Sequence, residues 1–99
     1  MFLHITHVQY LQEYTLQLTF NTGMMKRVNL QDELEGDIFE PLRDLHLFKQ
    51  VAIDPDMHTI SWPNGADFAP EFLDEIGEPV SPQERQNMPP FSTMQPIPA

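Results

Sequence analysis

The segment of residues 60–70, with the sequence ISWPNGADFAP, constrains the fold of this chain more than any other part. It holds the only tryptophan, Trp62, and the following Pro63 disfavours the α conformation at that residue. The segment therefore begins as an extended strand. Asn64 and Gly65 come next, and both residue types tolerate the positive φ angles of a tight turn. These residues predict a strand that ends in a turn, with Trp62 facing the core.

An amphipathic helix follows this turn. Pro70 suits the first turn of a helix, because the backbone N–H that proline lacks would have no partner there. Apolar residues recur with the three- and four-residue spacing of one helix face, at Ala69, Phe72, Leu73 and Ile76. Gly77 is typical of a helix end. We expect the Asp67 carboxylate to cap this helix; the alternative is a small polar pocket that Asp67 lines together with His58 and Trp62.

Alternating apolar and polar residues predict strands in the first third of the chain. The clearest alternation has Leu16, Leu18 and Phe20 on its inward face. After a short glycine-containing loop at residues 21–23, the pattern resumes over residues 24–30 and predicts a hairpin. An earlier strand changes its inward parity between Ile5 and Val8, which indicates a β-bulge near residues 6–7.

Pro41 argues against one long helix in the middle of the chain, because proline beyond the first turn removes a hydrogen bond and clashes. Two short helical pieces are expected instead, one opening near Pro41 and one over residues 44–48. A strand at residues 51–53 then pairs with residues 59–62. The fold class that follows is α+β: a small single domain with an antiparallel meander of three strands, a short helical segment, a two-stranded hairpin, a C-terminal amphipathic helix and a proline-rich tail.

The composition changes at Gly77, because six of the ten prolines fall within the last 23 residues. We therefore expect a domain over residues 1–76 and an extended or disordered tail over residues 77–99. Four apolar tail residues recur at every third position: Met88, Phe91, Met94 and Ile97. A polyproline II helix has three residues per turn, so this spacing lines them along one edge and favours a partner-binding segment. The alternative is a flexible tail whose period is chance.

The net charge of −10 bears on the kind of partner. Residues 1–76 hold thirteen acidic residues against four basic ones, which leaves a net charge of −9. Duplex DNA repels such a surface unless the basic residues cluster, so we expect no nucleic-acid binding by this chain alone. A basic protein partner fits the negative field, and solubility alone is the alternative explanation of the charge.

Cysteine is absent, and the N-terminus lacks the basic start and apolar run of a signal peptide. The sequence also has no apolar run of the roughly 18 residues that a membrane span needs. These features favour a cytoplasmic protein without a membrane partner. A homo-oligomer remains open.

The sequence carries no recognisable catalytic or metal-binding pattern. It has no G-x-S-x-G motif, no cysteine nucleophile and no glycine-rich phosphate loop. The acidic runs at residues 32–40 and 54–56 lack the ligand spacing of a calcium loop. His4 and His7 are three residues apart on a strand, which places them on opposite faces. We therefore predict a non-enzyme without catalytic residues, cofactor or metal.

Three motifs resemble a bacterial family known as domain of unknown function number 2442. They are LQLTFxxG at residues 16–23, FEPLxDxxxF at residues 39–48 and, the most specific, IxWPNGADxAPExL at residues 60–73. The resemblance covers residues 1 to about 76 and implies a small α+β fold. It carries over no catalytic residues, since none are established for the family.

The resemblance also implies a function. Members are often encoded beside another short protein and are viewed as possible antitoxins of toxin–antitoxin pairs. Some relatives carry an added helix-turn-helix segment, whereas the tail of this chain is too rich in proline for one. Our leading hypothesis is an acidic binding module that neutralises a cognate protein, for which a basic toxin is one candidate. The alternative is a transcriptional or nucleic-acid accessory protein, and an enzyme with an unrecognised site comes third.

Overall fold

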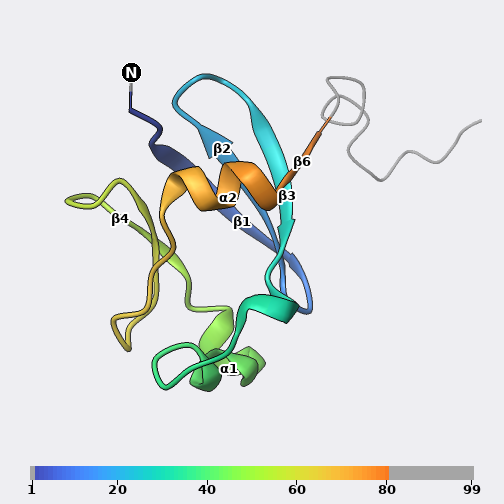
Figure 1. Cartoon of the computed structure of the whole chain (residues 1–99), viewed down its shortest axis with the longest axis vertical. Coiled ribbons are helices and arrows are strands. Elements are labelled where there is room, and N and C mark those ends of the chain that lie inside the picture. Colours follow the sequence, from blue (N-terminus) through green and yellow to red (C-terminus); the bar gives the residue numbers. More distant parts are fainter. Residues whose placement is uncertain (1, 81–99) are drawn as a thin grey trace, which may run out of the picture.

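Two antiparallel sheets and several short helices build the fold over residues 2–80, the part of the chain that the structure, a computed structural model, describes (Figure 1). The main sheet has the strand order β1-β2-β3-β6, and β4 pairs with β5 in a separate hairpin. The strands are β1 (Ile5–Gln12), β2 (Thr15–Phe20), β3 (Met25–Asn29), β4 (Ala52–Asp54), β5 (Thr59–Ser61) and β6 (Glu78–Pro79). The helices are the 3₁₀ turns η1 (Gln31–Glu33) and η2 (Glu40–Arg43) and the α-helices α1 (Leu45–Phe48) and α2 (Pro70–Ile76). The predicted α+β class is confirmed.

The strands β1, β2 and β3 form the predicted meander. At the turn between β2 and β3, the Gly23 N–H donates to the Phe20 carbonyl at 2.9 Å. Gly23 has a φ of 92°, which glycine adopts without steric cost because it lacks a Cβ. The register of β1 against β2 shifts between Ile5 and His7, at the place where the parity change predicted a bulge. The shift allows both Ile5 and Val8 to pack against the core.

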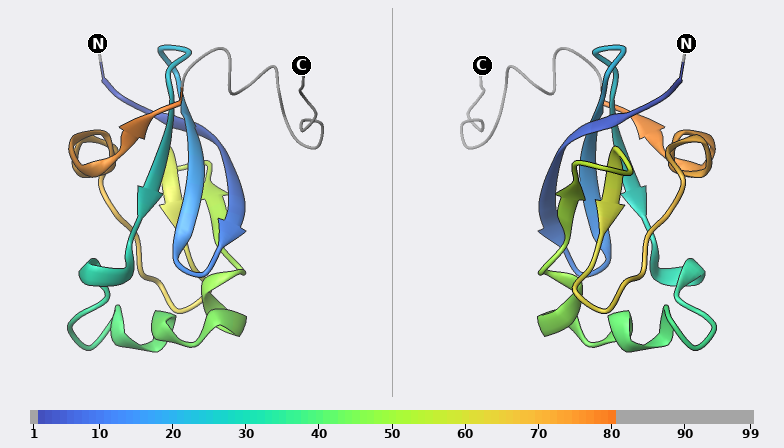
Figure 2. Two further views of the ribbon diagram at one scale, coloured as in Figure 1. Left: turned by 90° about the vertical axis from the view of Figure 1, so that its right-hand side faces the viewer. Right: turned by 90° about the vertical axis from the view of Figure 1, so that its left-hand side faces the viewer.

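The second hairpin and α2 cover one face of the main sheet. Both views in Figure 2 place β4 and β5 against the same side of the meander, and α2 contacts β3. The core lies between these layers. Its fully buried side chains come from most elements of the fold: Ile5, Leu16, Leu18, Phe20, Val28, Leu30, Leu34, Leu42, Phe48, Ile60 and Leu73. Burial of these apolar surfaces is the main favourable contribution to folding.

The connection between β3 and β4 forms the two short helical pieces that Pro41 predicted. The first is η2, and the second is α1, with the extended residue Asp44 between them (φ −74°, ψ 112°). The Asp44 side chain accepts a hydrogen bond from the His46 N–H at 3.0 Å and so caps α1. Leu42 and Phe48 are fully buried, which ties both pieces to the core.

The predicted capping role of Asp67 is wrong. The N-cap of α2 is Ala69, and no side chain caps this helix. Asp67 is exposed, and its backbone forms an isolated antiparallel bridge with Ser61. The bridge and the extended backbone at Ala69 (φ −66°, ψ 140°) leave Asp67 two residues ahead of the N-cap.

Gly77 ends α2 as predicted, although its backbone is extended rather than left-handed (φ −77°, ψ 157°). The reason for glycine here is close packing. A Cβ at this position would lie 2.9 Å from the Leu73 carbonyl oxygen and 3.0 Å from Val28 Cγ2.

The packed part of the chain extends past the predicted boundary at Ile76. Strand β6 pairs antiparallel with β3, and beyond it the Val80 N–H donates to the Met25 carbonyl at 2.9 Å. Val80 itself is buried. The remainder of the predicted tail lies outside the described residues, including its candidate partner-binding side chains Met88, Phe91, Met94 and Ile97.

Gly65 occupies a positive-φ position in the predicted turn, with φ of 92° and nothing within 4 Å of a Cβ built on it. Replacing Gly65 with Val therefore tests backbone conformation alone. We expect Gly65→Val to lower the free energy of unfolding by about 1 kcal/mol or more, because a β-branched residue resists positive φ. Gly65→Asn should cost less, since Asn tolerates this region. Urea unfolding of the two variants measures the difference, and equal stability of all three proteins would contradict the assignment.

Candidate partner-binding surface

Trp62 is part of the core and lies directly before the turn at residues 63–66. Its side chain is 4% exposed, and its ring lies 5.7 Å from that of Phe48 and 5.9 Å from that of Phe68. The indole Nε1–H donates to the Phe48 carbonyl oxygen at 2.8 Å, so the one polar group of the side chain has a partner. The predicted core position of Trp62 agrees with this geometry.

The turn that follows Trp62 connects two distant parts of the chain. The Trp62 N–H donates to the Ala66 carbonyl at 3.0 Å, and the Gly65 N–H donates to the Trp62 carbonyl at 2.9 Å. Asn64 Oδ1 accepts from the Ala66 N–H, which leaves its Nδ2 free to donate to the Ile38 carbonyl at 2.9 Å. Asn64 therefore fixes the loop that precedes η2, 26 residues away in the sequence.

This loop belongs to an acidic segment, which we define as residues 32–44. Six carboxylates lie within it: Asp32, Glu33, Glu35, Asp37, Glu40 and Asp44. All are exposed except Glu33, which is half-buried. The backbone of the segment is held at two further points. Arg43 Nε donates to the Leu34 carbonyl at 3.0 Å, and the Tyr14 hydroxyl donates to the Arg43 carbonyl.

The acidic segment has a shallow depression that is widely open to solvent. It is lined by Asp37, Glu40, Pro41 and Arg43. Ile38, which follows Asp37, is 44% exposed although it is a large apolar residue. The carboxylates of Asp37 and Glu40 at this depression can accept the N–H donors of a lysine or arginine, and Pro41 offers apolar surface to its aliphatic stem.

The three residues of the alternative polar pocket, His58, Trp62 and Asp67, have different environments. His58 stacks on His4, with ring centroids 4.2 Å apart and an interplanar angle of 12°. Trp62 is buried in the core, whereas His58 and Asp67 are exposed. Among residues 2–80, no group of three or more His, Cys, Asp or Glu side chains is placed to hold a metal ion.

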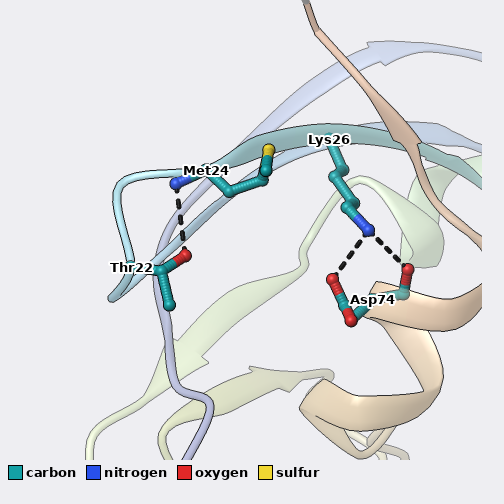
Figure 3. Close-up of polar contacts among 4 residues, drawn as sticks. All are labelled: Thr22, Met24, Lys26 and Asp74. Carbon is teal, nitrogen blue, oxygen red and sulfur yellow. Dashed lines mark hydrogen bonds and ion pairs between the residues drawn. The ribbon is translucent and has the colours of Figure 1, made fainter.

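Lys26 and Asp74 form an ion pair that sequence analysis missed (Figure 3). Lys26 Nζ lies 2.7 Å from Asp74 Oδ1 and donates to the Asp74 carbonyl at 2.8 Å. Its side chain is only 13% exposed, because it reaches from β3 to α2. A cation at the last turn of a helix is favourable to the helix dipole. An acidic residue near the C-terminus of a helix is unfavourable to the helix dipole, but Asp74 is paired there with the Lys26 ammonium.

The paired methionines of the β2–β3 hairpin have different environments. Met24 is 46% exposed, and its N–H donates to Thr22 Oγ1 at 3.3 Å (Figure 3). Met25 is half-buried and lies beside the end of β6.

None of the helices within residues 2–80 is long and apolar enough to cross a membrane.

Comparison with known proteins places the chain in a family. Residues 5–76 match the family model described as "Protein of unknown function (DUF2442)". The match spans the meander, the acidic segment, the Trp62 turn and α2. Neither the curated proteins nor the solved structures yielded a match. The chain is therefore a member of the DUF2442 family, as the three sequence motifs predicted.

Proposed function

We propose that this protein is a non-enzymatic binding module that recognises a basic protein partner through its acidic segment. The observation that carries the proposal is the shallow depression in that segment. Asp37 and Glu40 line it together with Pro41 and Arg43, and Asn64 holds the loop backbone at the exposed residue Ile38. A carboxylate surface on a fixed backbone loses little conformational freedom on binding, which favours affinity.

The charge distribution supports a basic partner. Three basic side chains between residues 2 and 80 contact their own fold as follows: Lys26 binds Asp74, Arg43 binds the Leu34 carbonyl, and the Lys49 ammonium lies 5.4 Å from the centre of the Tyr10 ring. The negative field of the remaining carboxylates would accelerate encounter with a positively charged protein and disfavour acidic ones. Within this proposal, binding neutralises the partner, as in an antitoxin, and takes place in the cytoplasm. The family resemblance described above supports that role.

The test removes charge from the acidic segment without changing the shape of its side chains. We expect the triple variant Glu35→Gln, Asp37→Asn, Glu40→Gln to lose a co-purifying basic protein when the tagged chain is isolated from its native host. The matched control is Asp56→Asn, Asp67→Asn, Glu75→Gln, which changes the net charge equally at exposed positions outside the segment. Retention by the control and loss by the triple variant supports the proposal. Equal retention by both variants contradicts it.

Nucleic-acid binding is the main competing function, and it makes an opposite prediction. We expect the purified chain to bind duplex DNA more weakly than about 10⁻⁴ M near physiological salt, because binding requires phosphate neutralisation by a basic face. Fluorescence anisotropy with a labelled duplex, repeated at several salt concentrations, measures this. Micromolar binding that weakens steeply with salt would favour the accessory-protein function instead.

A further inference from the structure

The outer edge of β1 is a strand edge without charged side chains. Strand β1 has the sequence ITHVQYLQ, which contains no Asp, Glu, Lys or Arg in a chain of net charge −10. It occupies one end of the strand order of the main sheet, and both views in Figure 2 show it at the lateral margin. The start of the edge is covered by the second hairpin, where the Ile5 N–H donates to the His58 carbonyl at 2.9 Å. Proteins usually protect such edges with charges or proline, because unpaired N–H and C=O groups template pairing with another strand.

The hydrogen-bonding pattern identifies which backbone groups face outward. The Phe20 N–H donates to the Met24 carbonyl, so Phe20 faces β3, and by alternation Leu18 and Leu16 also face β3. Their register partners on β1 are Val8 and Tyr10. In an antiparallel pair of strands, two opposite residues that do not hydrogen-bond to each other point their N–H and C=O groups away from the partner strand.

The N–H and C=O groups of Val8 and Tyr10 therefore point away from β2, toward the open part of the edge. The Tyr10 side chain packs edge-to-face on Phe48 with ring centroids 6.2 Å apart, which fixes this part of the strand. Val8 and Tyr10 are both half-buried, and the Lys49 ammonium lies 5.4 Å from the centre of the Tyr10 ring.

We propose that β1 pairs antiparallel with β1 of a second copy of this chain, with the twofold axis at Gln9. In this register Val8 lies opposite Tyr10 of the partner, and Tyr10 lies opposite Val8 of the partner. Each of these two pairs exchanges both N–H···O bonds, which makes four hydrogen bonds and joins two sheets into one. The two Gln9 residues face each other as a non-bonded pair, with Cα atoms about 4.5 Å apart.

The occupant is a second copy because the edge is complementary to itself. The strand presents an outward N–H donor and C=O acceptor at both Val8 and Tyr10. An identical antiparallel strand presents the same groups in the matching order. The absence of Asp and Glu from β1 matters equally, since two chains of net charge −10 repel each other elsewhere. The charge next to Tyr10 is the positive one of Lys49, which does not add to the repulsion between acidic chains. The nearest acidic residue in the sequence, Glu13, would lie roughly 26 Å from Glu13 of the second copy, given about 3.3 Å per strand residue. At physiological ionic strength that separation is several Debye lengths.

Two single-cysteine variants test the register directly, because the natural chain has no cysteine. We expect Gln9→Cys to form a disulfide-linked dimer under mild oxidation, since its expected Cα separation falls within disulfide range. The control is Gln17→Cys, whose residue lies opposite Gln9 on the neighbouring strand β2. Its two copies would be three strand spacings apart, about 14 Å, which is too far for a disulfide. A dimer yield from Gln9→Cys no greater than that from Gln17→Cys overturns the proposal.

Sedimentation equilibrium tests the association without cysteine. We expect the 11.5 kDa chain to dimerise reversibly, and more tightly as salt rises, because salt screens the repulsion between acidic surfaces. Gln9→Lys should weaken the dimer by about tenfold, because it places like charges directly opposite. Gln17→Lys makes the same change in net charge and should not weaken it. A chain that stays monomeric at concentrations up to about 1 mM overturns the proposal, since even the weakest specific association would appear there.

Discussion

Trp62→Ala is expected to lower the free energy of unfolding by about 3–5 kcal/mol, which is a large share of the stability of a small domain. The side chain is 4% exposed and contacts the rings of Phe48 and Phe68, so truncation leaves a cavity at the centre of the aromatic core. It also removes the hydrogen bond from Nε1 to the Phe48 carbonyl. Urea unfolding followed by far-UV circular dichroism measures the loss, because the variant no longer has a tryptophan to report by fluorescence.

Trp62→Phe separates the ring from the hydrogen bond. It keeps an aromatic ring in the cavity and loses the N–H donor, so we expect a cost of about 1–2 kcal/mol. The ordering parent, Phe, Ala in decreasing stability is the expected result. An alanine variant as stable as the parent would show that Trp62 is not a core residue and would favour a ligand-stacking role.

Gly77→Ala is expected to cost about 1–3 kcal/mol through overpacking. The added Cβ would lie 2.9 Å from the Leu73 carbonyl oxygen, 3.0 Å from Val28 Cγ2 and 3.1 Å from Lys26 Cβ. The first of these is a backbone atom and the second belongs to a fully buried residue, so neither can move away easily. Relief of the contacts with Val28 and Lys26 requires α2 to move from β3, which would also weaken the ion pair between Lys26 and Asp74.

The control for Gly77 is Gly36→Ala. Gly36 has a φ of 97° and no atom within 4 Å of a built Cβ, so its cost arises from backbone conformation alone. Hydrogen exchange distinguishes the two mechanisms. The Val80 amide, which donates to the Met25 carbonyl, should exchange faster in Gly77→Ala and at the parental rate in Gly36→Ala. Stabilisation by Gly77→Ala, as is usual for glycine in a compatible conformation, would contradict the packing argument.

Local rules were sufficient for most elements of this fold. The bulge at the start of β1, the Gly23 and Gly65 turns and the break at Pro41 each follow from a few neighbouring residues. Turn chemistry depends on the φ range of glycine and on the missing N–H of proline, and both are visible in the sequence.

The missed features depend on residues that are far apart in the chain. Asn64 binds the Ile38 carbonyl across 26 residues, and Lys26 binds Asp74 across 48. Neither contact has a local signal, and the acidic run alone does not predict a fixed backbone or a depression. Strand β6 was assigned to the tail because Pro79 resembles the proline-rich sequence that follows. Its strand conformation arises from pairing with β3. The β-propensity of only two residues is too weak a signal to predict a strand.

Pro79 bears on how large an assembly the proposed β1 pairing could build through the described residues. Val80 directs its N–H to β3, so by alternation Pro79 is the residue of β6 that faces outward. Proline has no N–H, and this side of the sheet therefore offers no donor at that position. A protein with two competent edges adds copies head to tail without limit, as in a fibril, whereas a protein with one competent edge stops at a closed pair. Under the proposed pairing, Pro79→Val would restore an outward N–H donor at the β6 edge of the sheet.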